Sequence, residues 1–129
     1  MSNFDIIKAH YEASTRGDLE GMLAPLGPDT KWTEMDGFPC AGTYTGPDEV
    51  KENVFFVLGR DWDGTFKHEL ESLHDAGDTV VAVGNYSATH PATGKSFQAR
   101  VVHVWTFRDG QVVGFEQFCD TLKVAEAMQ

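Results

Sequence analysis

The 129-residue sequence is poor in basic residues and contains no long apolar run. Lys and Arg together number 10, against 20 Asp and Glu, which gives a formal net charge of −10. Nucleic acids and anionic membrane surfaces bind clustered Lys and Arg, so this charge argues against both as partners. No stretch approaches the roughly 20 apolar residues that are needed to span a bilayer.

Cysteine is also scarce. Only Cys40 and Cys119 occur, and they form no Cys-x2-Cys pair. A small secreted scaffold would carry more cysteines, because disulfides replace a large core in such proteins. The opening Met-Ser-Asn-Phe-Asp has neither the basic region nor the apolar run of a signal peptide. We therefore expect a reduced, cytoplasmic protein.

Motifs for metals and cofactors are missing as well. The sequence has no His-x3-His pair and no Asp-rich loop that would indicate a metal site. Gly-rich phosphate-binding or dinucleotide-binding loops are also absent. We expect a function that needs no cofactor and no metal.

What is present is the composition of one globular domain. Hydrophobic residues make up 41% of the chain and charged residues 23%, and the length supports one core but not two. We therefore treat residues 1–129 as a single domain.

Helical patterns dominate the first half of the chain and strand patterns the second. The predicted helices run from Ser2 to Gly17 and over Leu19–Leu26, Pro47–Leu58 and Leu122–Met128. Pro25 should distort or shorten the second of them. Strands are predicted over Thr30–Asp36, Gly64–His74, Thr79–His90 and in a final hairpin, with a loop or short hairpin at Gly37–Gly46. This order predicts an α+β fold in which helices cover one face of a curved sheet.

The final hairpin, Phe97–Phe118, has the most informative pattern. Asp109-Gly110 is a dipeptide that closes tight turns between two apolar strands. Alternation places His103 on the same face as the large apolar side chains of its strand, including Trp105. A histidine on such a face is either a hydrogen-bonded core residue or part of a site.

The opposite face of this hairpin is apolar where a solvated face would be polar. Val102, Val104 and Phe118 lie there by alternation. Because a single chain offers nothing to cover them, we expect a second copy to do so and predict a homodimer through the outer sheet face.

A family resemblance emerges from motifs that follow one another along nearly the whole chain. They are Tyr11-x5-Gly17-Asp18-Leu19, Trp32-Thr33-Glu34, Gly42-Thr43-Tyr44-x-Gly46, Thr93-Gly94-Lys95-x-Phe97, Arg108-Asp109-Gly110-Gln111-Val112-Val113 and Phe118-x-Asp120. With them the chain resembles SnoaL-like and ketosteroid isomerase-like members of the NTF2-like superfamily. The resemblance implies a cone-shaped, cystatin-like fold: a curved antiparallel sheet and three N-terminal helices enclose one pocket. It also implies dimerisation through the outer sheet face.

Glu34 is the first candidate catalytic residue. It shares a strand face with Trp32, and burial beside apolar groups would raise its pKa toward a range useful for proton transfer. A solvated strand end is the alternative from the residues alone. The resemblance places Glu34 where ketosteroid isomerases carry their base aspartate.

His103 and His10 complete the predicted catalytic group. The resemblance places His103 where the isomerases hold a protonated aspartic acid that donates to the substrate oxyanion. It places His10 at their donor tyrosine, although Tyr11, one residue later, is the alternative. The isomerase trio of Asp, Tyr and Asp is thus replaced by Glu, His and His.

Further residues are expected to bind substrate: Tyr11, Trp32, Phe38, Phe55, Tyr86, Trp105, Phe115 and Gln117. Gln117 falls where polyketide cyclases keep a base aspartate, and a carboxamide cannot serve as that base. Arg100 projects to the outer face, so the Asp-Arg-Asp grouping of limonene-epoxide hydrolases is unsupported. His68 and His74 lie among acidic residues and are expected on a solvated strand edge.

Two functions follow as hypotheses. The first is a cofactor-independent isomerase or a cyclase- or dehydratase-like lyase that acts on a hydrophobic carbonyl compound of steroid, terpenoid or polyketide size. Glu34 would remove a proton next to the carbonyl, and His103, helped by His10 or Tyr11, would stabilise the enolate. The second is a non-catalytic ligand-binding or structural module. An open cavity reached by Glu34 and His103 would favour the first, and a cavity plugged by Trp105 or Tyr86 the second.

Overall fold

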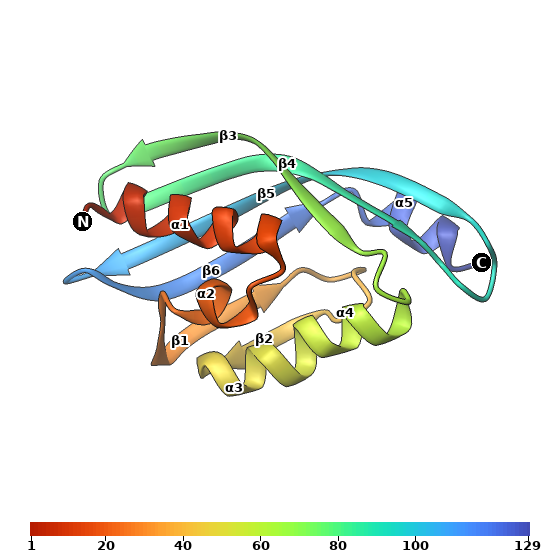
Figure 1. The fold of residues 1–129 in the computed structure, drawn as a ribbon, viewed down its shortest axis with the longest axis horizontal. Coiled ribbons are helices and arrows are strands. Elements are labelled where there is room, and N and C mark those ends of the chain that lie inside the picture. The colour runs from red at the N-terminus through yellow and green to blue at the C-terminus, as the bar shows by residue number, and fades with distance from the viewer.

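A computed structural model describes all residues, 1–129, and shows helices packed on the inner face of a six-stranded sheet (Figure 1). The helical elements are α1 (Asn3–Arg16), α2 (Leu19–Leu23), α3 (Gly46–Val50), α4 (Phe56–Asp61) and α5 (Thr121–Ala127). The strands are β1 (Leu26–Glu34), β2 (Gly42–Thr45), β3 (Lys67–Ala76), β4 (Thr79–Thr89), β5 (Ser96–Arg108) and β6 (Gln111–Cys119). This arrangement confirms the predicted curved-sheet α+β fold.

The first helix begins and ends where the sequence predicts. The Ser2 hydroxyl accepts the Asp5 backbone N–H and the Asp5 side chain accepts the Ser2 N–H, so the capping box is complete. Gly17 ends the helix in the left-handed conformation, with φ 70°. The caps fix the two ends of α1, and the helix buries His10 and Tyr11 together with Ile7 and Ala13.

The second helix is shorter than predicted. It ends at Leu23 rather than Leu26, because Pro25 cannot continue a helix and Leu26 already belongs to β1. The prediction that the first strand starts at Thr30 is also wrong. The strand begins at Leu26, and a register shift between Leu26 and Lys31 accommodates Pro28.

The third predicted helix is interrupted. Between α3 and α4 the residues Lys51–Phe55 form a π-helical turn. One extra residue in a turn rotates the side chains that follow, and such turns are frequent at functional sites. Here Val54 and Phe55, from the turn, and Leu58, from α4, line a cavity.

The strand order is β2-β1-β6-β5-β4-β3. All neighbours are antiparallel except β1 and β6, which run parallel, so the sheet is not wholly antiparallel as predicted. The tight turn between β5 and β6 is confirmed at Asp109 and Gly110, both with positive φ. Parallel pairing is possible because residues 35–110 separate β1 from β6 and supply the crossover.

The inner face of β5 forms the centre of the core. The predicted inward residues of this strand, Phe97, Ala99, Val101, His103, Trp105 and Phe107, are all buried. Arg100 is exposed on the other face, as predicted, and forms an ion pair with Glu71 from β3. None of the helices is long and apolar enough to cross a bilayer.

Candidate active site

A cavity of about 230 Å³ lies between the inner face of the sheet and the helices. Its walls are formed by His10, Tyr11, Ser14, Met22, Trp32, Glu34, Val54, Phe55, Leu58, Gly59, Gly64, Phe66, His68, Tyr86 and His103. Of these residues only Gly59 and Gly64 are classed as exposed, and a Cβ atom on either would meet open space. The mouth of the cavity therefore lies beside these two glycines.

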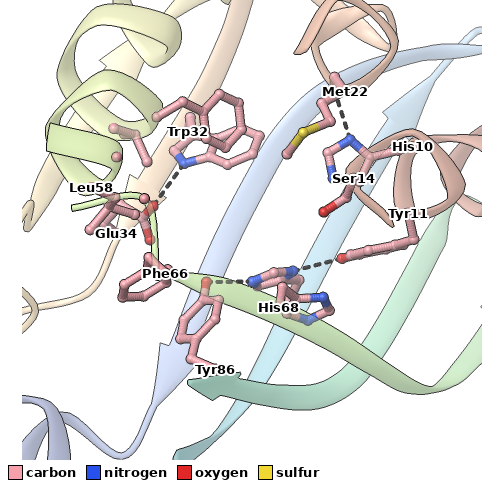
Figure 2. Close-up of a pocket in the computed structure, with 15 residues that line it drawn as sticks. His10, Tyr11, Ser14, Met22, Trp32, Glu34, Leu58, Phe66, His68 and Tyr86 are labelled. Carbon is pink, nitrogen blue, oxygen red and sulfur yellow. Dashed lines mark hydrogen bonds between the residues drawn. The ribbon is translucent and has the colours of Figure 1, made fainter. Parts of the chain in front are cut away.

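Strand register explains how Glu34 and His103 reach the same cavity. Glu34 on β1 pairs with Gln117 on β6, and Gln117 pairs with His103 on β5. The three residues form one row across neighbouring strands, so Glu34 and His103 are two strand spacings apart, about 10 Å. Both side chains line the cavity, and Figure 2 labels Glu34 there.

Glu34 is a buried carboxyl group in a mostly apolar environment. Only 3% of its surface is exposed. One oxygen, Oε1, accepts the indole N–H of Trp32 at 3.2 Å, while Oε2 is buried without a hydrogen-bond partner. Burial raises the pKa of Glu34 to about 7, and the Trp32 hydrogen bond opposes this shift. Near neutral pH the group can therefore both take up and release a proton.

His103 is held between two tyrosines. Its Nδ1 lies 2.6 Å from the Tyr11 hydroxyl and its Nε2 lies 2.8 Å from the Tyr86 hydroxyl. Burial lowers the pKa of His103 well below its ordinary value, and the nearby His68 and His10 lower it further. The imidazole is thus neutral, and both of its nitrogens are engaged.

Each tyrosine oxygen also accepts a hydrogen bond from a second partner. The Trp105 indole N–H donates to the Tyr11 oxygen at 2.9 Å, and the Gln117 amide donates to the Tyr86 oxygen at 3.0 Å. Burial raises the pKa of both phenols above the ordinary value, so they are neutral. Trp105 and Gln117 do not line the cavity but hold the residues that do.

His10 lies on the α1 side of the cavity (Figure 2). Its Nδ1–H donates to the Met22 carbonyl at 2.7 Å, because a carbonyl oxygen can only accept. Burial lowers the pKa of His10 to about 4, so at neutral pH its Nε2 carries a lone pair rather than a proton. In this state His10 offers a ligand an acceptor, not the donor suggested by its sequence position.

His68 corrects the sequence prediction. It was expected on a solvated edge with His74, and His74 is exposed, but His68 is half-buried and lines the cavity. Its ring stacks on His103 with centroids 4.9 Å apart, and burial lowers its pKa to about 4. The alternation of Phe66, His68 and Leu70 was the available signal, since it places His68 on an apolar face.

The predicted substrate-binding residues divide into two groups. Tyr11, Trp32, Phe55 and Tyr86 line the cavity, whereas Phe38, Trp105, Phe115 and Gln117 do not. Phe115 stacks on Trp32 with centroids 3.6 Å apart and packs edge-on against Trp105, so these rings form the layer behind the wall.

Sequence reasoning missed several lining residues: Ser14, Met22, Val54, Leu58, Gly59, Gly64, Phe66 and His68. Most come from helices and the loop after α4, where apolar or small residues carry no signal that separates a cavity wall from a packed core. The structure contains no group of His, Cys, Asp and Glu side chains that could hold a metal ion.

Comparisons with known proteins agree with this fold. The model of the SnoaL-like domain matches residues 7–115. An NTF2-like protein from Burkholderia thailandensis is 54% identical, with 100% of this chain and 98% of that chain covered and a TM-score of 0.97. An NTF2-like protein of unknown function from Burkholderia pseudomallei is 32% identical, with 100% and 99% covered and a TM-score of 0.84.

A third similar structure is TerC co-crystallised with polyporic acid. It is 29% identical, with 98% of this chain and 97% of that chain covered and a TM-score of 0.85. No curated protein matches the chain.

Proposed function

The chain belongs to the SnoaL-like domain family of NTF2-like proteins, and we propose that it is a cofactor-independent isomerase or lyase for a hydrophobic carbonyl compound. Glu34 acts as the base, and the groups around His103 stabilise the negative charge that develops on the carbonyl oxygen. The alternative is a module of the same fold that binds a ligand without transforming it.

The observation that carries this proposal is the state of Glu34. A buried carboxyl group with one oxygen left unpartnered at a cavity is expensive to maintain, because burial disfavours its charged form. A pKa of about 7 makes the group half ionised near neutral pH, which suits general acid–base catalysis. A purely structural carboxyl would be expected to satisfy both oxygens.

The proposed chemistry conserves protons. Glu34 carboxylate takes a proton from the carbon next to the substrate carbonyl, and the C–H electron pair becomes the double bond of an enolate. A hydrogen bond from the cluster of Tyr11, Tyr86 and His103 stabilises the enolate oxygen. The protonated Glu34 then returns the proton to another carbon of a conjugated substrate, which is isomerisation. In lyase chemistry a β-substituent instead leaves with the electron pair of its bond to carbon, and the proton on Glu34 passes to this leaving group. The Nε2 of His10 accepts a substrate hydroxyl.

Cavity size and one similar protein support an organic ligand of modest size. A cavity of 150 Å³ can hold benzene, and drug-sized ligands occupy about 300 to 1,000 Å³. The 230 Å³ found here suits one or two rings better than the four rings of a steroid. TerC was co-crystallised with polyporic acid, and this supports a small organic ligand for the present chain as well.

Proton exchange tests the catalytic role directly. We expect the protein to catalyse exchange of the protons next to the carbonyl of 1-tetralone, a two-ring ketone, in deuterated buffer, followed by NMR. Glu34→Gln should reduce this exchange at least about 100-fold, the usual contribution of a general base. Glu52→Gln, which removes an exposed carboxylate of the same size, should leave it unchanged. Full exchange activity in Glu34→Gln would refute the assigned role.

The binding-only alternative makes a different prediction. It requires that the wild-type protein bind 1-tetralone and give no exchange above the rate of the buffer. In that case Glu34→Gln would change affinity alone. Measuring binding and exchange on the same samples therefore separates the two functions.

The outer sheet face supports a homodimer. Phe118 is 43% exposed, and Val81, Val83, Val102 and Val104 beside it are only half-buried. Register places Val83 opposite Val102 and Val102 opposite Phe118, so the apolar side chains are continuous across β4, β5 and β6. A second copy would cover this face, and sedimentation as a monomer at micromolar concentration would contradict the dimer.

The two cysteines are unpaired, which is compatible with the cytoplasm that we propose as the compartment of this protein.

A further inference from the structure

The hydrogen bonds around His103 contain one proton too many. Two contacts join the ring to Tyr11 and Tyr86, and each contact needs one proton. A neutral imidazole supplies one N–H and one lone pair. It therefore donates to one tyrosine and accepts the hydroxyl proton of the other. The first tyrosine keeps its own proton, and this proton has no acceptor within the cluster.

The two tyrosines are equivalent in this count. The Tyr11 oxygen already accepts the N–H of Trp105, and the Tyr86 oxygen already accepts the amide N–H of Gln117. The Trp105 indole has no acceptor atom, and the Gln117 amide keeps its NH2 group toward Tyr86 because its Oε1 accepts the Met35 backbone N–H at 3.4 Å. Neither residue therefore takes up the extra proton. Either tautomer of His103 gives the same number of hydrogen bonds. The tautomer decides only which tyrosine holds the unused proton.

We propose that the tyrosine left with the unused hydroxyl proton donates it to an acceptor oxygen of the ligand, and that the tautomer of His103 selects Tyr11 or Tyr86 for this task. His103 is then a positioning residue, and the phenols are the groups that touch the ligand. Both phenols (Figure 2) line the same cavity as the His103 imidazole, so the unused proton can reach a molecule bound there.

This inference rests on the proposed function only in assuming that the cavity binds a small organic molecule. It adds that the ligand must present an acceptor oxygen, such as a ketone carbonyl, at the end of the cavity formed by the tyrosines. The cavity can then take a ligand in two orientations, with its oxygen at Tyr11 or at Tyr86. A hydrocarbon of the same shape would leave the buried hydroxyl proton without a partner.

The network can be tested without any ligand. In Tyr86→Phe, the Tyr11 hydroxyl should donate to Nδ1 of His103. If Nδ1–H donated to Tyr11 instead, both the Tyr11 hydroxyl proton and the Nε2 lone pair would have no partner. The ring proton then sits on Nε2. In Tyr11→Phe, the Tyr86 hydroxyl should donate to Nε2 by the same reasoning, so the ring proton sits on Nδ1. Side-chain ¹⁵N NMR distinguishes the tautomers, and His103→Gln assigns the signals. The same tautomer in both variants, or a doubly protonated ring, would overturn the proposal.

Tyr44→Phe is the matched control, because it removes the third phenol of the chain. The Tyr44 hydroxyl donates to the Cys40 carbonyl and is not part of the cavity wall. The variant should leave the His103 signals as in the wild type. Altered signals would show that the spectrum reports general loosening of the fold, and the argument from the two cavity tyrosines would fail.

A pair of probes tests the ligand-facing proton. Wild-type protein should bind 1-tetralone about 5- to 10-fold more tightly than tetralin, which has the same two rings without oxygen. Binding of 1-tetralone, but not of tetralin, should shift the His103 tautomer ratio. Equal affinities, or signals that 1-tetralone does not move, would contradict the proposal. If neither probe binds, the proposed function fails. The hydrogen-bond arrangement around His103 is still tested, because the tautomers of Tyr86→Phe and Tyr11→Phe are measured without a ligand.

Discussion

Replacing Glu34 by Gln should stabilise the folded protein at alkaline pH and have little effect in acid. The carboxamide keeps the volume and an acceptor for the Trp32 indole, but it has no charge. Folding raises the pKa of Glu34 from 4.5 to about 7, so between these values the folded state holds a proton that the unfolded state has lost. Stability linked to this group is present below pH 4.5 and is lost as the pH rises through 7.

The size of the effect follows from the shift. Each pKa unit corresponds to 1.36 kcal/mol, so wild-type protein should lose about 3 kcal/mol of unfolding free energy over this range relative to Glu34→Gln. Urea denaturation at half-unit pH steps from 4 to 8.5 measures the difference between the two proteins. Glu52→Gln, an exposed position, should give a difference that does not vary with pH. If the difference in unfolding free energy between Glu34→Gln and wild type is also independent of pH, Glu34 is solvated, and the basis for its assigned role is lost.

Three further predictions concern other parts of the molecule. Burial lowers the pKa values of His10, His68 and His103, so below pH 6.5 the unfolded state binds more protons than the folded state. The free energy of unfolding should therefore fall between pH 6.5 and 4, by about 3 kcal/mol for His10 alone. Urea denaturation midpoints from pH 7 to 4 check this. Gly59→Trp should block the cavity mouth and abolish 1-tetralone binding, whereas Gly59→Ala should bind normally and gain about 0.5–1 kcal/mol of stability. Phe118→Lys should give monomers in analytical ultracentrifugation, since burying the 43% of Phe118 that is exposed contributes about 1 kcal/mol per copy and a lysine charge would have to lose its water there.

Local patterns identified much of the fold in advance. Ser2 with Asp5 and then Gly17 determine the ends of the first helix, because caps act through neighbouring backbone groups. Alternation in β5 determines that His103 points inward with Trp105, since strand side chains alternate regardless of what they meet. These features depend on residues a few positions apart, and the sequence contains that information directly.

Two features lie elsewhere than the sequence predicted. The first strand was predicted to start at Thr30, after Pro28 and Asp29, yet β1 already begins at Leu26, because Leu26 pairs with Val112 of β6, more than 80 residues away. His68 looked solvated because its sequence neighbours are acidic, but its face of the strand packs against Tyr11 and His103. For β1 a distant contact outweighs the local pattern, whereas for His68 the alternation of Phe66, His68 and Leu70 was a better guide than the charge of its neighbours.

By itself, then, the sequence determined the inward direction of His103, the caps of the first helix and the apolar outer face, because each follows from local patterns. For Glu34 the residues alone left a solvated strand end as the alternative. Only the tertiary structure decided that a parallel β1–β6 pair aligns Glu34, Gln117 and His103 in one row, and that both nitrogens of His103 are taken by tyrosines. Hydrogen bonds between α1, β4 and β5 depend on packing across the whole chain. For that reason the imidazole, first expected to donate to a ligand, became the group that positions two phenols.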